Sequence, residues 1–196
     1  VKEDNYRVAA AAAYLRESYC NLSENERFKN MQLALKSTAP SAELKKLSFK
    51  YLENNNQRDT LITNIEYAVK NDVKNIAGID IISLPWTNKL SASNLTITPP
   101  RYFPLDLSQL FYVDSETEVI NIQIPEGKSL VEGIAPVSLS NDYIDYKLDV
   151  KEDGKILSLS RSLTFKKTLV PAEKVQEFQN LYSRIAAVDN KQLALK

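Results

Sequence analysis

Histidine is absent from the 196 residues, and cysteine occurs once, at Cys20. Imidazole is the side chain that most often serves as a general base near neutral pH and as a metal ligand. Its absence excludes Ser/His/Asp and Cys/His catalytic arrangements within the chain, and a single thiol excludes an internal disulfide. Because the chain has a single thiol and no imidazole, it lacks the clustered ligands of a zinc site, and we predict no metal or cofactor.

Glycine is also scarce, and charge of one sign never accumulates. None of the four glycines falls in a G-x-x-x-x-G-K-[ST] phosphate loop, so a nucleotide site of that kind is excluded. Lys plus Arg and Asp plus Glu both total 25, which predicts neither nucleic-acid binding nor a basic membrane patch. No apolar run approaches the roughly 18–20 residues of a membrane span. Since the chain begins at Val1 rather than Met, we expect an excerpt of a longer protein.

The first half of the chain mixes helical and strand patterns. Residues 6–19 combine an alanine run with tyrosines and a valine that suit a strand, and we predict a strand there. Ser23 to Glu26 reads S-E-N-E, a capping box, and apolar residues at helical spacing follow it, which predicts a helix over about 24–37. Alternation at period two and short apolar runs then predict three strands, at 47–51, 61–69 and 76–84.

The second half alternates more regularly. Three stretches place apolar residues on one face of a strand. They lie at 120–124, 144–150 and 157–165. Pro125 to Gly127 predicts a turn, and Asp153-Gly154 predicts a hairpin between two of these strands. An amphipathic helix follows at about 172–186, and a last short strand is expected at 193–195.

These patterns predict a mainly β protein with minor α content, built from antiparallel β-sandwich-like modules. Pro99, Pro100 and Pro104 mark a composition shift, so we expect two domains. Residues 1–98 form a β-rich joining domain with one capped helix, and residues 99–196 form a sandwich-like C-terminal domain with a late helix.

Several short motifs in the chain follow one another in a familiar order. In the second half they are Arg101-Tyr102-Phe103-Pro104, Ile122-Gln123-Ile124-Pro125-Glu126-Gly127, Ser160-Arg161-Ser162-Leu163, a helix that starts at Pro171 and contains Phe178, and Leu193-Ala194-Leu195-Lys196. In the first half they are Tyr14-Leu15-Arg16, the capped helix, Leu52-Glu53-Asn54 and Leu84-Pro85-Trp86. Together they resemble the uncharacterised C-terminal domain that follows the catalytic core in bacterial exported transglutaminase-like proteins.

The resemblance implies an accessory role outside the catalytic core. A transglutaminase-like core works through Cys, His and Asp, so the absence of imidazole means that Cys20 is not carried over as its nucleophile. No catalytic residue of the family transfers to this chain, and we predict that the chain is not itself an enzyme. The core is expected upstream of Val1 and is the expected partner. The resemblance also implies a periplasmic or cell-surface location.

Aromatic residues around the junction offer an alternative function. Exposed aromatic rings stack on sugars or anchor protein interfaces, so this stretch is the candidate surface for a cell-surface polysaccharide or partner protein, unless the rings pack inside. Its residues are Trp86, Tyr102, Phe103, Phe111 and Tyr112.

Two arginines and three aspartates complete the candidates. Arg161 lies in the apolar row of its strand, and we expect it and Arg101 to be structural, paired with a carboxylate or backbone carbonyls, rather than to bind an anionic ligand. A hydrolase that uses carboxylates alone is a third hypothesis. Asp142, Asp145 and Asp149 would be its acids, but the alternation places Asp145 and Asp149 on a solvated strand face.

Overall fold

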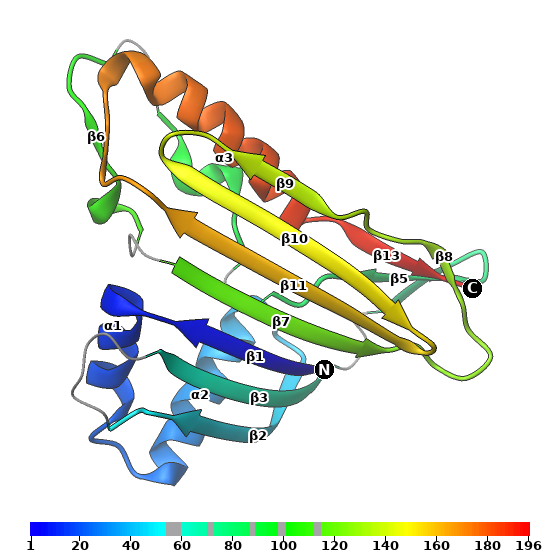
Figure 1. Cartoon of the computed structure of the whole chain (residues 1–196). Helices are drawn as coiled ribbons and strands as arrows, with labels where there is room; N and C mark the ends of the chain where they lie inside the picture. Colours follow the sequence, from blue (N-terminus) through cyan, green and yellow to red (C-terminus); the bar gives the residue numbers. More distant parts are fainter. Residues whose placement is uncertain (54–59, 70–72, 87–88, 98–100, 112–114) are drawn as a thin grey trace.

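A large antiparallel sheet runs through the whole molecule (Figure 1). The computed structural model of the chain describes residues 1–53, 60–69, 73–86, 89–97, 101–111 and 115–196. The sheet has seven strands in the order β2-β3-β1-β7-β11-β10-β9, and all neighbours run antiparallel. Its strands are β1 (Lys2–Arg7), β2 (Ala42–Lys50), β3 (Leu61–Val69), β7 (Ser115–Gln123), β9 (Val137–Ser140), β10 (Ile144–Asp153) and β11 (Ile156–Phe165).

Helices and a second sheet cover one face of this large sheet. The helices are α1 (Ala9–Tyr19), α2 (Glu24–Thr38) and α3 (Val175–Asp189), with the short 3-10 turns η1 (Ala92–Leu95), η2 (Leu107–Gln109) and η3 (Ala172–Lys174). The second sheet, of four strands, contains β4 (Val73–Ile76), β5 (Ile79–Ser83), β13 (Gln192–Leu195) and β8 (Leu130–Glu132) in that order. A two-stranded ladder joins β6 (Leu105–Asp106) to β12 (Leu169–Val170). The predicted mainly antiparallel, sandwich-like fold is confirmed.

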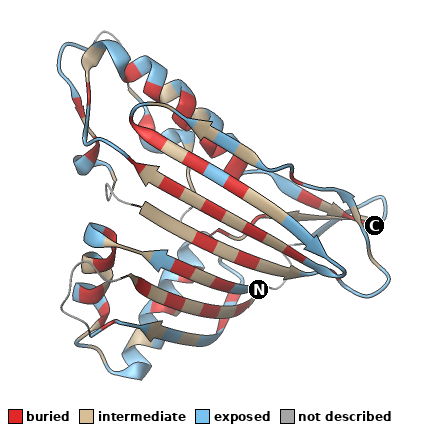
Figure 2. Cartoon of the chain, in the orientation of Figure 1, coloured by how far each residue is buried: buried red, intermediate tan, exposed pale blue. Residues whose placement is uncertain are grey.

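The two faces of the large sheet differ because side chains alternate along each strand. On β11, Leu157, Leu159 and Leu163 are buried, whereas the serines between them are half-buried (Figure 2). Register carries this alternation across the sheet, since directly paired residues share a face. The covered face therefore forms the core, and the opposite face is polar and open to solvent.

Two hydrophobic clusters lie on the covered face. The smaller one packs α1 and α2 against β2 and β3, and the larger one packs α3, β13 and the segment before residue 98 against β7, β10 and β11. Leu84, Trp86 and Leu95 belong to the larger cluster, and β1 pairs with β7 along its whole length. The expected division between residues 98 and 99 therefore does not follow the packing, because the sheet and the core both run across it.

The predicted strand at residues 6–19 is wrong. β1 ends at Arg7 and α1 occupies Ala9–Tyr19, because alanine has the highest helix propensity and Ala11 and Ala12 are small enough to pack close to the sheet. The N-terminal half thus has two helices instead of one. α2 begins as predicted, with Ser23 and Glu26 in a reciprocal capping box.

The predicted strand at residues 76–84 is correct only in part, because Ile79–Ser83 form β5 whereas Ile76 is the last residue of β4. β4 ends at Ile76, and Ala77 and Gly78, both at positive φ (52° and 84°), turn the chain into β5. The expected hairpin at Asp153-Gly154 is present between β10 and β11. The predicted turn after β7 is present as well, and Gly127 lies there at φ 78°.

Candidate functional site

Charged side chains stand in a row on the covered face at the centre of the sheet. Asn5 on β1 pairs with Glu118 on β7, and Glu118 pairs with Arg161 on β11. Because paired residues share a face, all three side chains point toward the helices. Glu118 and Arg161 are 0% and 3% exposed, so this is a buried polar network rather than a surface one.

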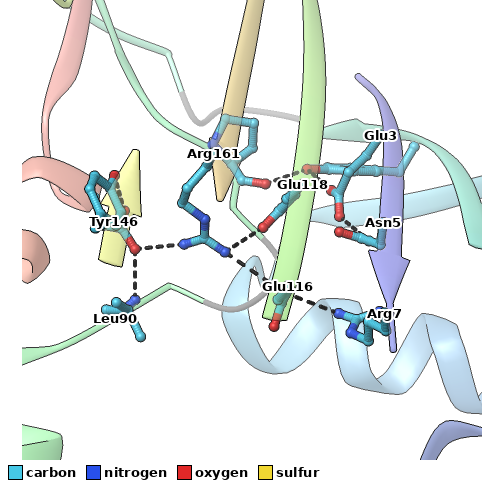
Figure 3. A network of polar contacts seen from close by, with 11 residues as sticks. Glu3, Asn5, Arg7, Leu90, Glu116, Glu118, Tyr146 and Arg161 are labelled. Atoms are coloured by element: carbon cyan, nitrogen blue, oxygen red, sulfur yellow. Dashed lines mark hydrogen bonds and ion pairs between the residues drawn. The ribbon is translucent and has the colours of Figure 1, made fainter. Parts of the chain in front are cut away.

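Arg161 is the centre of the network (Figure 3). Its Nη2 donates to Glu118 Oε2 at 2.6 Å, and its Nη1 donates to Asp189 Oδ2 at 2.6 Å. The guanidinium also lies over the indole ring of Trp86, with Cζ 4.8 Å from the ring centroid. Burial alone would lower the pKa of Arg161, but the carboxylates of Glu118 and Asp189 raise it overall, so the side chain stays charged.

Asp189 joins the end of α3 to the sheet and to the loop before η1. Besides Arg161, it accepts a hydrogen bond from the hydroxyl of Tyr146 at 2.8 Å and one from the backbone N–H of Leu90 at 3.1 Å. Burial, and then the charge of Asp189, raise the pKa of Tyr146, so its hydroxyl remains a donor. The fully buried carboxylate therefore accepts hydrogen bonds from Leu90, Tyr146 and Arg161, which fix where α3 ends on the sheet.

Glu3 and Asn5 continue the row on β1. The amide of Asn5 donates to Glu3 Oε1 at 2.6 Å, and the hydroxyl of Tyr67 donates to the backbone carbonyl of Pro85 at 2.8 Å and lies 3.5 Å from Glu3 Oε2. These contacts connect β1 and β3 with the segment that follows β5. Together with Glu118, Arg161 and Asp189, they form a row of buried polar side chains between the two hydrophobic clusters, which we call the polar seam.

The row reaches solvent at Arg7. Its Nη2 lies 3.5 Å from Glu116 Oε1, and the two side chains are 11% and 21% exposed. Arg7, Tyr14 and Leu15 line two neighbouring hollows, of about 400 and 280 Å³. The larger one continues between α1, α2 and the sheet, and the smaller one continues toward Leu110 and Phe111.

The hollows of this arrangement can hold ligands. Its charged groups, however, are engaged with one another and fix helices and strands in place. Among the described residues, no group of three or more Cys, Asp or Glu side chains is placed to hold a metal ion. Within the same residues, none of the helices has both the length and the apolar character needed to span a bilayer. The site is thus a charged, hydrogen-bonded seam that opens at one end into apolar hollows.

A match to a known protein family covers most of the residues of this seam. Residues 79–195 match the family described as Domain of Unknown Function with solved-structure structure (DUF3858). The chain belongs to the DUF3858 family. No curated protein and no solved structure gives a significant match.

The DUF3858 match divides the seam in an informative way. Trp86, Glu118, Arg161 and Asp189 all lie within residues 79–195, whereas β1 lies outside. The central Arg161 cluster is thus contained in the DUF3858 part. The open end at Arg7 arises where β1 joins that part.

The aromatic residues predicted to form one surface are separated in this DUF3858 protein. Trp86 is 3% exposed and lies beneath Arg161, so it offers no surface. Phe111 is half-buried and stacks on Phe165, with ring centroids 4.9 Å apart. Tyr102 and Phe103 are exposed, and Tyr112 lies outside the described residues. The predicted surface is therefore reduced to Tyr102 and Phe103.

Arg101 braces the backbone next to these two rings. It is exposed, and it donates to the carbonyls of Phe103 and Pro104 at 2.8 and 3.1 Å. Its role in the described structure is thus local, and it points away from the core. Asp145 and Asp149 lie on the open face, paired with Lys166 at 2.9 Å and Lys147 at 2.7 Å.

Sequence reasoning missed Asp189 and Glu118. Asp189 lies at the end of an amphipathic helix, where an acidic side chain is normally predicted to be exposed to solvent. Glu118 did carry a signal, since it precedes Ile120 and Ile122 in the same alternating row. An acid in an apolar row indicates a buried cation nearby.

Proposed function

We propose that this chain is a non-catalytic accessory region of a larger transglutaminase-like protein, packing on or positioning its catalytic core at the cell surface or in the periplasm. The order of the motifs, from Arg101 to Leu195, supports the link to such proteins. The proposal thus places the DUF3858 domain beside a catalytic core, and it assigns the catalysis to another part of the polypeptide.

The chemistry of the buried seam supports a non-catalytic role. General acid–base work needs a group whose proton can leave or arrive near neutral pH. Here Arg161 is held charged between Glu118 and Asp189, and the raised pKa of Tyr146 keeps its proton in place. These groups hold elements together instead of exchanging protons with a substrate.

The exposed aromatic pair Tyr102–Phe103 carries the proposal. The two rings are 80% and 77% exposed, and they directly precede β6 at one end of the molecule (Figure 1). Leu169, on the partner strand β12, and Leu110, just after η2, are 54% and 46% exposed. Tyr102 and Phe103 are consecutive exposed aromatic residues, and exposed apolar side chains that lie together are typical of a protein contact surface. Arg101 holds the backbone that presents them.

The test is association with a separately produced transglutaminase-like core, measured by titration calorimetry at several salt concentrations. We expect saturable binding that tolerates salt, because the proposed contact is apolar. The double variant Tyr102→Ser, Phe103→Ser should weaken binding at least tenfold. Leu33→Ser is the matched control, since Leu33 is 68% exposed on α2, away from this end. Equal binding by the double variant and the wild type would refute the assignment of this surface.

A second candidate function, binding of a cell-surface polysaccharide, is supported by a different place. A hollow of about 620 Å³ lies between α2 and β2. It is lined by three aromatic rings and by polar side chains suited to sugar hydroxyls. They are Phe28, Phe49 and Tyr51, with Glu24, Asn25, Arg27 and Glu53 among the polar residues.

Tyr51 distinguishes this hollow from an ordinary surface dip. It adopts φ 65°, a strained conformation for a residue with a side chain, and its ring is 59% exposed. Its carbonyl accepts a hydrogen bond from Arg16 Nε at 3.2 Å, which holds this conformation. A screen of neutral glycans and peptidoglycan fragments against the wild type and Tyr51→Gly tests this candidate. Gly keeps the backbone and removes the ring, so binding should fall only if the ring stacks on the sugar.

A further inference from the structure

One hollow of the molecule lies along the edge of the large sheet. β2 is the outermost strand on that side, and α2 runs beside it (Figure 1). The hollow of about 620 Å³ is lined by three consecutive residues of β2, which are Leu47, Ser48 and Phe49. Consecutive side chains of a strand point to opposite faces of the sheet. A hollow that touches all three therefore follows the backbone edge of β2 and does not lie over one face alone.

The backbone groups of Leu47 and Phe49 point outward at this edge. On β3, Tyr67 exchanges both backbone hydrogen bonds with the first residue of the chain, at 2.8 and 3.0 Å. Hydrogen-bonded pairs recur at every second residue of an antiparallel ladder, so Ile65 and Thr63 also bond toward β1. These two residues are the partners of Leu47 and Phe49 on the other side of β3. The N–H and C=O groups of Leu47 and Phe49 therefore point away from β3.

Gln32 shows that the outward groups of β2 accept an amide as their partner. Near the start of the strand, the side-chain amide of Gln32 on α2 accepts from the N–H of Leu44 at 2.7 Å and donates to the carbonyl of Ala42 at 3.0 Å. The amide thus takes the place of a neighbouring strand at that end of the edge. Farther along, no residue in the described parts of the chain bonds to the outward backbone groups of Leu47 and Phe49.

The side chains beside this open stretch of edge are apolar on one face and polar on the other. Leu47 and Phe49 lie on the face covered by the helices but are only half-buried, whereas Ser48 between them is exposed. Phe28 of α2 lines the same hollow and is 36% exposed. An extended chain with apolar side chains at every second residue would find backbone partners along β2 and apolar contacts toward α2. Addition of a peptide strand to an exposed sheet edge uses this combination of contacts.

We propose that the groove between β2 and α2 binds an extended peptide segment of another polypeptide, added as a strand antiparallel to β2. The peptide residues opposite Leu47 and Phe49 exchange backbone hydrogen bonds with them and direct apolar side chains toward Phe28, and the residue between is polar. The site is separate from the Tyr102–Phe103 surface, so either proposal stands without the other. It is an alternative to a polysaccharide in the same hollow, because a sugar chain does not repeat N–H and C=O groups at the spacing of a strand.

Amide hydrogen exchange, followed by NMR on the full chain with the acetylated and amidated peptide Thr-Val-Thr-Val-Thr, tests the proposal. At saturating peptide we expect the N–H groups of Leu47 and Phe49 to exchange at least tenfold more slowly, and that of Ser48, which faces β3, to be unchanged. N-methylation of both valines removes the donors that face β2 and should weaken binding at least tenfold. N-methylation of the middle threonine, whose N–H points away from β2, is the matched control and should be tolerated.

A pair of variants on α2 tests the apolar contact. Phe28→Ala removes a wall of the hollow and should weaken the peptide at least fivefold, whereas Leu33→Ala, at a leucine of the same helix that is 68% exposed and outside the hollow, should leave binding unchanged.

Four outcomes would overturn the proposal. They are unchanged exchange at Leu47 and Phe49, equal binding of the peptide with two N-methylated valines, wild-type affinity in folded Phe28→Ala, and binding of chitotriose without binding of the peptide, which would leave the hollow to a polysaccharide. Slower exchange at Leu47 and Phe49 that depends on protein concentration and needs no peptide would assign the edge to a second copy of this chain instead.

Discussion

Replacing Arg161 with leucine removes the cation that two buried carboxylates share. Glu118 and Asp189 are both 0% exposed, and each lies 2.6 Å from a guanidinium nitrogen. Breaking one buried ion pair by removing a partner costs about 3–5 kcal/mol. Here two pairs are lost at once, so we expect a loss of at least about 3 kcal/mol, out of a total stability of about 5–15 kcal/mol for such a domain.

Urea unfolding followed by tryptophan fluorescence measures this loss directly. Trp86 is the only tryptophan, is buried, and lies against Arg161, so its emission reports the seam. The triple variant Arg161→Leu, Glu118→Gln, Asp189→Asn removes the orphaned charges and should recover part of the stability. Arg184→Leu, on the exposed side of α3, is the matched control and should be near neutral.

The pH dependence of the Arg161→Leu variant gives a second readout. Without the cation, the folded variant keeps two carboxylates buried and uncompensated, and burial disfavours the charged form of such groups. The folded state then binds more protons than the unfolded state, so the variant gains stability relative to the wild type as pH falls from 8 toward 5. A loss of unfolding free energy below about 1 kcal/mol at pH 7, or a stability difference from the wild type that does not change with pH, would refute the conclusion that buried ion pairs stabilise the seam.

Three further changes test other parts of the structure. Ser23→Ala removes the N-cap of α2 and should cost about 1 kcal/mol of unfolding free energy in urea titrations, whereas Ser23→Asp should cost little. Tyr146→Phe removes a buried hydroxyl donor and should cost about 1–3 kcal/mol; a neutral result would contradict its hydrogen bond in the seam. The hydrogen bond from Ser140, and then that from Lys166, lower the pKa of Asp145 below its usual 3.8, so this stabilisation is present above pH 3.8 and is lost as pH falls further. Thermal melts of Asp145→Asn should therefore lie below those of the wild type at pH 7 and converge with them near pH 2.

Alternation in the sequence predicted most of the large sheet, because a strand that covers a core repeats at period two. It indicated the strand of Arg161 together with the side to which that residue points. The prediction failed at residues 6–19, because we gave the tyrosines, which favour a strand, more weight than the alanine run, which favours a helix. The helix forms there because Ala12 and Tyr19 join the smaller hydrophobic cluster, whose other members come from α2, β2 and β3, later in the chain.

The partners of the seam were beyond local patterns. Asp189 meets Arg161 only because α3 returns across the sheet, and no spacing along the chain encodes that return. The hollow at Arg7 has the same origin, since its walls come from α1 and from the segment around Leu110. Contacts of this kind depend on the order of strands in the sheet, which hydrophobic periodicity does not specify.

The central position of β1 has a consequence for how the chain folds. β2, β3, α1 and α2 are complete once residue 69 has been synthesised, and they already contain the smaller hydrophobic cluster. β1 then remains an edge strand with unpaired backbone groups until β7 is made, more than 40 residues later. During that interval β1 can accept the same strand from another molecule, so exchange of β7 between two chains competes with correct folding at high concentration.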